Sequence, residues 1–258
     1  MSLSGRTAVV TGASRGIGEA IARALASEGA SLLLASTTQA RVEAVAASIR
    51  EAGGRAAAVV CDVADPSSVD ALGRAANEHL GRVDILVNNA GIATAGAVHR
   101  TSVEEWTRVL AVNATGTFLC TRAFLPGMLE RKWGRVVNVA STAGLHGARY
   151  VGAYAASKHA VIGLTRCTAA ESAAAGVTAN AVCPGYADTE MTRQSVARIV
   201  KRTGMSEEKA LEALLATSPQ KRLVTPEEVA SAVVYLCGEA ARGINGQALV
   251  IDGGGLLS

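Results

Sequence analysis

The chain has 258 residues, of which 49% are hydrophobic and 18% charged, so it can bury a large core and is not a disordered protein. A net charge of only +3, without any cluster of basic and aromatic residues, argues against a nucleic-acid partner. No stretch approaches the roughly 18 apolar residues of a membrane span, and residues 1–6 show no signal-peptide core. Five scattered cysteines without metal-ligand spacing are typical of reduced thiols in a cytoplasmic protein, so we expect neither disulfides nor a metal site.

Short apolar runs alternate with longer helical segments along the whole chain. The alternation predicts a single α/β domain over residues 1–258, with a doubly wound, Rossmann-type parallel sheet of about seven strands and helices on both faces. The expected strands are Thr7–Thr11, Ser31–Ala35, Ala56–Cys61, Ile85–Asn88, Arg135–Ala140, Thr178–Cys183 and Ala248–Ile251. The expected helices are Gly16–Glu28, Gln39–Ala52, Pro66–His79, Val103–Arg131 (as two helices, or one bent near Asn113–Gly116), Ala153–Ala174 and Pro226–Cys237.

The first expected strand runs into a glycine loop, Thr11–Gly18, with glycines at positions 12, 16 and 18. Glycine permits a tight turn and a close approach of the backbone to a phosphate. The N-terminus of the following helix supplies N–H donors and the positive end of the helix dipole. Because the loop lies between a strand and a helix, we expect it to bind the diphosphate of a dinucleotide, with a plain structural turn as the alternative.

Two further loops at the ends of expected strands carry polar groups. Asp62, after the third strand, can accept a hydrogen bond from an adenine amino group, or it can cap the helix at Pro66 together with Asp65. Asn88–Gly91 close the fourth strand. Their amides can hold neighbouring loops, and their small residues let a cofactor lie against the backbone, although a plain turn would have the same composition.

Tyr154 and Lys158 are four residues apart and therefore lie on one face of the expected helix. A nearby ammonium favours the phenolate, so we expect Lys158 to lower the pKa of Tyr154 from its usual value of about 10. Ser141 could hydrogen-bond the same substrate oxygen as the phenol. Taken alone, the two residues could equally be a chance pair on a half-buried helix, because the pattern is short.

Residues 189–220 interrupt the rhythm of strands and helices with a polar segment. It should contain two helices, Met191–Thr203 and Ser206–Ala216, and Ser206 followed by two glutamates is a good helix N-terminus. An inserted helical pair beside the carboxyl edge of a sheet is typical of a substrate lid.

Together these features resemble the short-chain dehydrogenase/reductase family, whose motifs occur here in the same order and spacing through nearly the whole chain. The matching residues are Thr11–Gly18, Asp62, Asn88–Gly91, Asn113, Ser141, Tyr154, Lys158, Pro184-Gly185 and Thr189. The resemblance implies that Tyr154 exchanges the proton with the substrate oxygen, while Lys158 binds the nicotinamide ribose and lowers the pKa of Tyr154. It also implies that Ser141 positions the carbonyl and that Asn113 holds a water linking the lysine to solvent. A hinge-stabilising amide is the alternative for Asn113.

The resemblance implies a nicotinamide cofactor, and an NAD-specific site usually has Asp or Glu after the second strand. Ser36, Thr37 and Thr38 stand there instead. Arg15 can reach a 2′-phosphate, Ser36 or Thr37 can donate to it, and Arg41 could add a contact or simply lie on a solvated helix face. We therefore expect NADP(H) rather than NAD(H), although the Arg that many NADP-dependent members carry after the second strand is absent. The expected cofactor-binding residues are Gly12, Ser14, Arg15, Gly16, Ile17, Gly18, Ser36, Thr37, Asp62, Val63, Asn89, Ala90, Gly91, Tyr154, Lys158, Pro184, Gly185 and Thr189.

The C-terminal half resembles two branches of the family, the 3-oxoacyl-thioester reductases and, in the lid, the 3-hydroxybutyrate dehydrogenases. The positions that hold a small carboxylate in the second branch match Ala93, Ala143 and Val151, with only Gln194 retained. A pocket without those donors should hold a carboxylate poorly, which favours a larger or less polar ketone. The loop before Tyr154 should add two substrate contacts, His146 and Tyr150.

Five cations on the expected lid have two interpretations. They could meet the phosphates of CoA or an acidic carrier protein, or they could lie on a solvated helix face balanced by glutamates. These residues are Arg193, Arg198, Lys201, Arg202 and Lys209.

The leading functional hypothesis is an NADP(H)-dependent reductase of a ketone or a 3-oxoacyl thioester. The alternative within enzymes is an NAD-linked dehydrogenase of a secondary alcohol, a 3-hydroxyacyl-CoA or 3-hydroxybutyrate. A nucleotide-binding protein without turnover would typically have lost the Tyr or the Lys. The resemblance also implies a homo-oligomer, a dimer or a tetramer, formed through helices Asn113–Arg131 and Ala153–Ala174.

Overall fold

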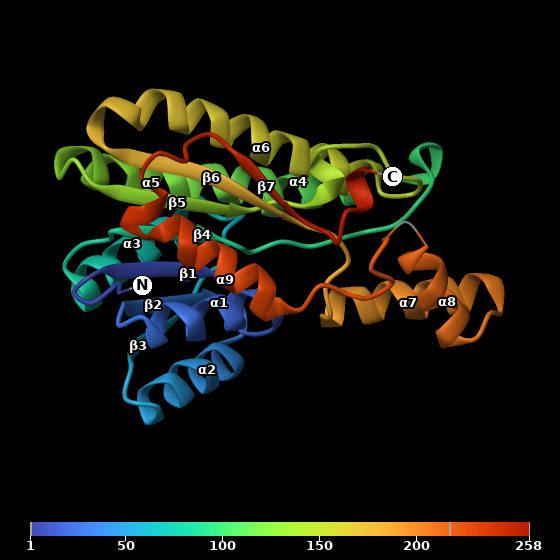
Figure 1. Ribbon diagram of the computed structural model, residues 1–258, viewed down its shortest axis with the longest axis horizontal. Coiled ribbons are helices and arrows are strands. Elements are labelled where there is room, and N and C mark those ends of the chain that lie inside the picture. The colour runs from blue at the N-terminus through green and yellow to red at the C-terminus, as the bar shows by residue number, and fades with distance from the viewer. Residues whose placement is uncertain (1, 217, 258) are drawn as a thin grey trace.

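The computed structural model describes residues 2–216 and 218–257, so Met1, Thr217 within the expected lid, and Ser258 lie outside the described residues. Parallel strands form one sheet in the order β3-β2-β1-β4-β5-β6-β7 (Figure 1). The order reverses direction at β1, which makes the sheet doubly wound, as expected. The strands are β1 Thr7–Thr11, β2 Ser31–Ser36, β3 Arg55–Val60, β4 Ile85–Asn88, β5 Gly134–Val139, β6 Val177–Pro184 and β7 Ala248–Ile251.

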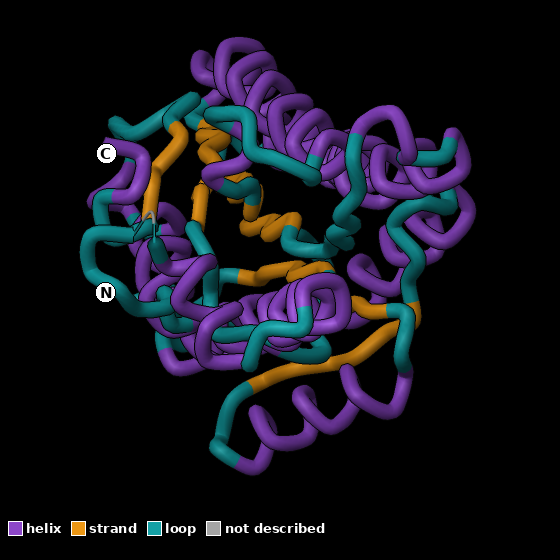
Figure 2. Tube along the Cα trace, turned by 90° about the vertical axis from the view of Figure 1, so that its right-hand side faces the viewer, coloured by secondary structure: helices purple, strands orange, loops and turns teal. Residues whose placement is uncertain are grey.

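Helices cover both faces of the sheet, and Figure 2 shows the strands between the two helix layers. One layer contains α1, α2 and α9, and the other contains α3, α5 and α6 (Figure 1). Successive residues of β1 alternate between them: Val10 belongs to the core that contains Ile21 of α1, and Val9 belongs to the core that contains Leu119 of α5. The helices are α1 Gly16–Ser27, α2 Gln39–Glu51, α3 Pro66–Leu80, α4 Val103–Leu110, α5 Gly116–Glu130, α6 Gly152–Ser172, α7 Glu190–Thr203, α8 Glu207–Leu215 and α9 Pro226–Cys237.

The expected elements are all present, with bounds that agree within two residues, except for the long segment Val103–Arg131. A π-helical turn, Ala111–Thr115, separates α4 from α5 there, close to the expected bend. Such turns are frequent at functional sites, and this one carries Asn113. In the part of the chain that the structure describes, no helix is both long and apolar enough to cross a membrane.

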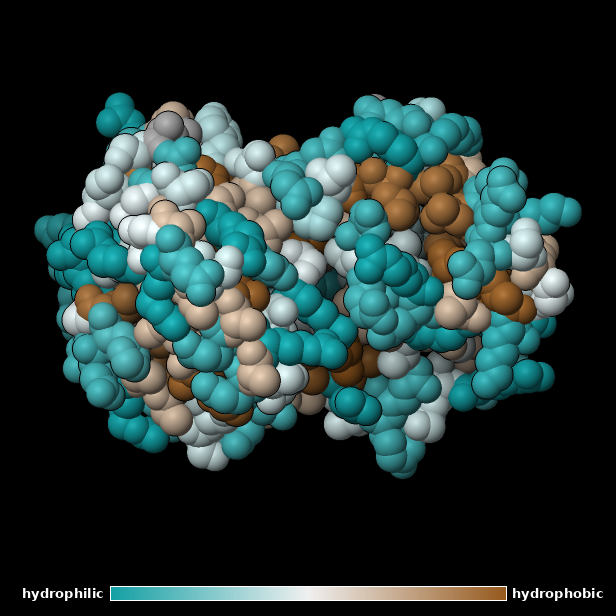
Figure 3. Space-filling model, turned by 90° about the horizontal axis from the view of Figure 1, so that it is seen from below, coloured by the Kyte–Doolittle hydropathy of each residue, from teal (hydrophilic) through white to brown (hydrophobic). Residues whose placement is uncertain are grey.

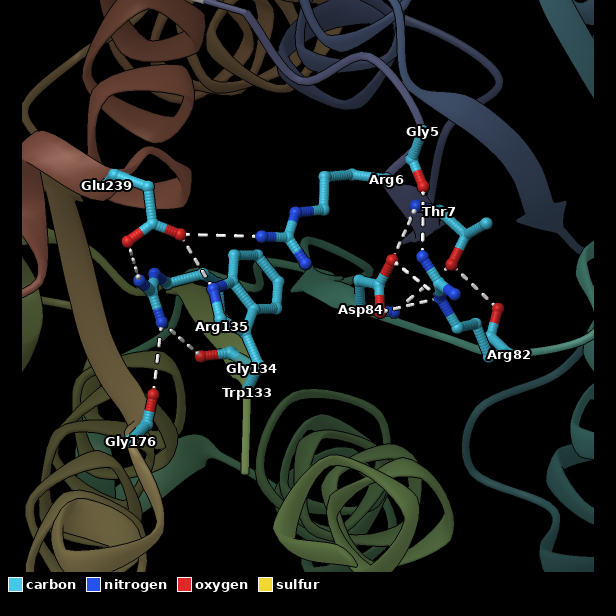
Figure 4. A network of polar contacts seen from close by, with 10 residues as sticks. All are labelled: Gly5, Arg6, Thr7, Arg82, Asp84, Trp133, Gly134, Arg135, Gly176 and Glu239. Atoms are coloured by element: carbon cyan, nitrogen blue, oxygen red, sulfur yellow. Dashed lines mark hydrogen bonds and ion pairs between the residues drawn. The ribbon is translucent and has the colours of Figure 1, made fainter. Parts of the chain in front are cut away.

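Arginines and the carboxylates of Asp84 and Glu239 form a network at the amino ends of the strands, opposite the ends that carry the expected site (Figure 4). The ring of Trp133 lies between two guanidinium groups, with its centre 3.5 Å from Cζ of Arg6 and 4.5 Å from Cζ of Arg135. Glu239 accepts a hydrogen bond of 2.7 Å from Trp133 Nε1 and pairs with both arginines, at 3.4 and 3.7 Å. Arg135 is almost fully buried. The network therefore joins the starts of β1 and β5 to the turn after α9.

Helix α9 begins with a reciprocal capping box that provides a stability test. Thr225 Oγ1 accepts from the backbone N–H of Glu228 at 3.2 Å, and Glu228 Oε2 accepts from the N–H of Thr225 at 2.7 Å. Replacing Thr225 by Ala should lower the free energy of unfolding by about 1 kcal/mol, because the cap of a helix that packs on α1 is lost. Urea denaturation measures this loss. Thr225→Ser keeps the hydroxyl and should remain close to the native protein; an equal loss in both variants would contradict the capping argument.

Candidate active site

A large cleft opens at the carboxyl ends of the strands, where doubly wound sheets bind ligands. Its volume is about 1310 Å³, and it is lined from the glycine loop at one end to α7 and α8 at the other. Figure 3 shows the surface hollowed beside the lobe in which α7 and α8 lie, with hydrophobic side chains exposed on that lobe. Within the described residues, no group of three or more potential metal ligands is present.

The glycine loop is clamped against the end of β4. Gly12 and Gly16 have φ angles of 65° and 56°, a left-handed conformation that favours glycine. A Cβ atom on Gly12 would lie 2.8 Å from Cα of Ala90, so no other residue fits without movement. The side-chain amide of Asn89 donates to the carbonyls of Thr11 and Gly12, both at 3.0 Å. The loop thus forms a bare backbone cradle that fits the diphosphate of a dinucleotide.

Every residue expected to bind the cofactor lines this cleft, including the segment Pro184-Gly185 and Thr189 at its lid end. The alternative interpretation of Asp62 as a cap of α3 does not hold. Asp65 caps that helix by accepting from Ser67 N–H, whereas Asp62 Oδ1 accepts from Ala64 N–H at 3.0 Å within its own loop. The Asp62 side chain is exposed at the cleft.

Helix α6 brings Tyr154 and Lys158 to the centre of the cleft. The Lys158 side chain is only 5% exposed, and its Nζ donates to the carbonyl of Val139 at the end of β5 at 2.8 Å. The same Nζ lies 5.6 Å from the centre of the Tyr154 ring. Burial disfavours the ammonium and lowers the pKa of Lys158 from 10.5 to about 8.

The pKa of Tyr154 is raised, not lowered as expected from its proximity to Lys158. Burial of the phenol is the largest cause, and a hydrogen bond with the Ser141 side chain opposes it only in part. The ammonium of Lys158 is directed to the Val139 carbonyl, so it does not offset this burial. Ser141 Oγ in turn accepts from Ala143 N–H at 3.1 Å, which fixes the serine at the start of a short turn.

Asn113 is fully buried and does not line the cleft. Its Oδ1 accepts from Ile92 N–H at 2.8 Å, and its Nδ2 donates to the Ile92 carbonyl and to Ser157 Oγ, both at 2.9 Å. A Cβ atom on Gly91 would lie 3.3 Å from Asn113 Oδ1 and 3.6 Å from Lys158 Nζ, so Gly91 lies close to both. Through these contacts the amide holds the loop after β4 against the π-helical turn and α6.

Most of the expected substrate residues line the cleft, but one does not. Gln194 is exposed, donates to Glu190 Oε1 at 3.2 Å, and does not line the cleft. The others line the cleft together with Val151; they are Ala93, Ala143, His146 and Tyr150.

Of the five cations on the expected lid, some line the cleft and others do not. Arg193 pairs with Asp188 at 3.0 Å, and neither Arg193 nor Lys209 lines the cleft. The other three do line it; they are Arg198, Lys201 and Arg202.

One cleft residue was missed by the sequence analysis. Tyr186 lines the cleft, is 45% exposed, and lies near enough to Tyr154 to raise the pKa of that phenol. Its place directly after Pro184-Gly185 at the end of β6 was the available signal, because residues that follow strands of this sheet enter the site.

A model of a known protein family matches most of the chain, from β1 into α7. Residues 6–199 match the model described as short chain dehydrogenase. The chain is a short-chain dehydrogenase. As a member of this family it is an NAD(P)-dependent oxidoreductase that acts on CH–OH groups.

Relatives of this dehydrogenase span nearly its whole length. It is 40% identical over 255 residues to D-beta-hydroxybutyrate dehydrogenase of Cupriavidus necator, covering 98% of both chains. It is 39% identical over 254 residues to the 3-oxoacyl-(acyl-carrier-protein) reductase FabG of Vibrio cholerae, again covering 98% of both. A solved structure of a variant actinorhodin polyketide ketoreductase with NADPH superposes with a TM-score of 0.94 at 40% identity, covering 98% of both chains.

Proposed function

We propose that this member of the short-chain dehydrogenase family is an NADP(H)-dependent reductase that converts a ketone or a 3-oxoacyl thioester to the secondary alcohol. The observation that carries the proposal is the meeting of Ser141, Tyr154 and Lys158 in one cleft with the glycine loop. When bound, NADPH supplies the hydride; the residues of the chain then have to orient the carbonyl and deliver a proton to its oxygen.

Tyr154 suits the role of proton donor. Because burial raises the pKa of its phenol, the group stays protonated near neutral pH and is ready to protonate the oxygen as negative charge develops on it. The Ser141 hydroxyl, hydrogen-bonded to the phenol, can donate to the same oxygen. Lys158, with a pKa of about 8, is mostly an ammonium at neutral pH, and its role in this proposal is to bind the nicotinamide ribose.

Helices α7 and α8, within residues 189–220, serve in this proposal as the substrate lid. They carry the side chains that line the cleft at the end away from the glycine loop, including Met191, Ile199 and Leu214. Closing such a segment would exclude water from the reacting carbonyl.

A substrate screen tests the proposal directly. The oxidation of NADPH and of NADH is followed by absorbance with acetoacetyl-CoA, acetoacetate and cyclic ketones as substrates. We expect NADPH-dependent reduction of the thioester or the cyclic ketones and little reduction of acetoacetate. Turnover with NADH alone would contradict the cofactor assignment, and no turnover with any ketone would contradict the reductase assignment.

Arg15 is the residue on which the preference for NADP(H) rests. It is exposed at the cleft, has no acidic residue after β2 opposite it, and shares a second hollow with Arg41.

Replacing Arg15 by Gln should weaken NADPH binding about tenfold, the value of one charge-assisted hydrogen bond, and leave NADH binding unchanged. Fluorescence titration measures both dissociation constants. Arg23→Gln, on the helix that follows the glycine loop and paired with Glu19, serves as control and should change neither dissociation constant. Equal losses for both cofactors would show that Arg15 does not read the 2′-phosphate.

An NAD-linked 3-hydroxybutyrate-type dehydrogenase is the second candidate, because the relative from Cupriavidus necator bears that name. The cleft itself weighs against it. Ala93, Ala143 and Val151 line the cleft with apolar side chains, and Gln194 faces away, so a small carboxylate would lack hydrogen-bond donors there. Oxidation of 3-hydroxybutyrate with NAD, at a rate above that of every ketone reduction, would favour this candidate.

We also propose that the protein acts as a homo-oligomer, a dimer or a tetramer, through α5 and α6. On α5 the large side chain of Phe118 is 44% exposed. Burial of such a group against a second copy is favourable. Sedimentation velocity at micromolar concentration distinguishes the monomer from the assembly.

A further inference from the structure

The residues that line the cleft are apolar in its buried part and positively charged at its exposed rim on the lid side. Ala143 is buried, and Ala93 and Val151 are partly buried. Among the exposed cations that line the same cleft, three face the lid side: Arg149 on the loop before Tyr154, and Lys201 and Arg202 at the end of α7. The site is therefore apolar next to the reacting groups and positively charged at its rim.

These three cations have no acidic partner within the described residues, in contrast to Arg193 and Arg222. Arg198 at the same cleft also forms no ion pair, and its Nε donates to the Gln194 carbonyl at 3.2 Å. Arg193 pairs with Asp188, and Arg222 is held by Glu228. The described carboxylates that line the cleft are Asp62, Glu190 and Asp252, and none of them forms an ion pair with these three cations. The three cations can therefore attract an anion.

A stacked pair connects the two sides of this rim. Cζ of Arg202 on α7 lies 5.0 Å from the centre of the Tyr150 ring on the facing loop. Tyr150 has a φ of 68°, a left-handed conformation that is costly for a residue with a side chain, and its carbonyl is held by Gly96 N–H at 2.7 Å. Backbone strain of this kind is concentrated at ligand clamps. The loop is thus fixed in the position that sets Arg149 and Tyr150 opposite the end of α7.

We propose that Arg149, Lys201 and Arg202 bind the phosphorylated arm of an acyl thioester whose 3-oxo group reaches Tyr154. A substrate that fits this cleft needs a neutral, apolar reacting end and an anion some distance away from it. Acyl thioesters of 4′-phosphopantetheine have this form, whether the arm is free in CoA or attached to a carrier protein. Guanidinium groups match phosphate oxygens in charge and in bidentate geometry. The inference rests on the reductase function proposed above and narrows its substrate class.

Three thioesters with the same acetoacetyl group test the inference. Acetoacetyl-CoA has the whole arm, acetoacetyl-4′-phosphopantetheine keeps one phosphate, and the acetoacetyl thioester of N-acetylcysteamine has none. Each is assayed with NADPH and the full-length native protein, Arg149→Gln or Arg202→Gln. We expect each substitution to lower kcat/KM for acetoacetyl-CoA about tenfold, as for one lost charge-assisted contact, and to leave the N-acetylcysteamine thioester unchanged.

The controls separate this inference from the function on which it rests. Lys209→Gln removes a cation from the same lid at a position outside the cleft and should leave all three substrates unchanged. A loss with the phosphopantetheine thioester as well as with CoA assigns the site to the arm shared with carrier proteins, and a loss with CoA alone assigns it to the nucleotide phosphates. If the native protein reduces all three thioesters and the substitutions affect them equally or not at all, the phosphate site is wrong while the reductase stands. If the native protein reduces none of them, the reductase proposal itself fails for thioesters.

Discussion

Replacement of Tyr154 by Phe is expected to lower turnover by about a hundred- to ten-thousandfold, the range for loss of a positioned proton donor. The substitution removes one hydroxyl and keeps the ring that packs beside Lys158. NADPH binding should therefore change little. The measurements are kcat for reduction of the best substrate in the screen and the dissociation constant of NADPH by fluorescence.

Tyr235→Phe is the matched control for this experiment. Tyr235 lies on α9 with 42% of its surface exposed and does not line the cleft, so the same chemical change there should leave kcat unaltered. Turnover that survives in Tyr154→Phe would show that another group protonates the substrate. Tyr186 would then be the first residue to test, because its phenol lies in the same cleft.

Replacement of Lys158 by Met should abolish turnover and change the pH dependence of stability. In the folded protein the pKa of Lys158 is about 8, whereas in the unfolded chain it is near 10.5. Between these values the unfolded state binds the proton and the folded state does not, so the free energy of unfolding rises with pH. The shift corresponds to about 3 kcal/mol gained by the native protein from pH 8 to pH 10.5. Below pH 8 both states hold the proton, and this contribution is constant.

The comparison with the variant isolates this effect. Other groups that titrate in the same range are common to both proteins, so the difference between their free energies of unfolding reports Lys158. Urea denaturation of both proteins at several pH values should show the native protein gaining relative to Lys158→Met as pH rises from 8 to 10.5. Parallel stability curves would contradict a lowered pKa of Lys158 in the folded protein, whatever the constant offset caused by the Val139 carbonyl that loses its donor.

Local sequence patterns were sufficient to predict the strands, most helices and the location of the site. The glycine loop was predictable because a left-handed turn between a strand and a helix demands glycine at fixed positions, here Gly12 and Gly16. Tyr154 and Lys158 were predictable as neighbours because their spacing places them on one helix face.

Properties set by long-range packing were not predictable in the same way. The raised pKa of Tyr154 depends on how deeply the phenol is buried, and no spacing encodes this. Gln194 lies on α7 close to cleft residues, yet the orientation of that helix turns it toward Glu190 and away from the cleft. The π-helical turn at Ala111–Thr115 depends on the contacts of Asn113 with Ile92 and Ser157, which come from two other parts of the chain.

The network around Glu239 has a consequence for how the protein is made. Arg6 and Glu239 are separated by 233 positions, so the first strand leaves the ribosome long before its carboxylate partner is synthesised. Helix α9 is also synthesised late. Until then the apolar side of α1, with Ile21 and Leu25, has no α9 to pack against. Contacts between residues so distant in sequence form slowly, and exposed apolar helix faces favour aggregation in the meantime. A nascent chain that stops before residue 226 would contain most of the sheet and all of the proposed catalytic residues, but the exposed face of α1 would make it a substrate for chaperones and not an enzyme.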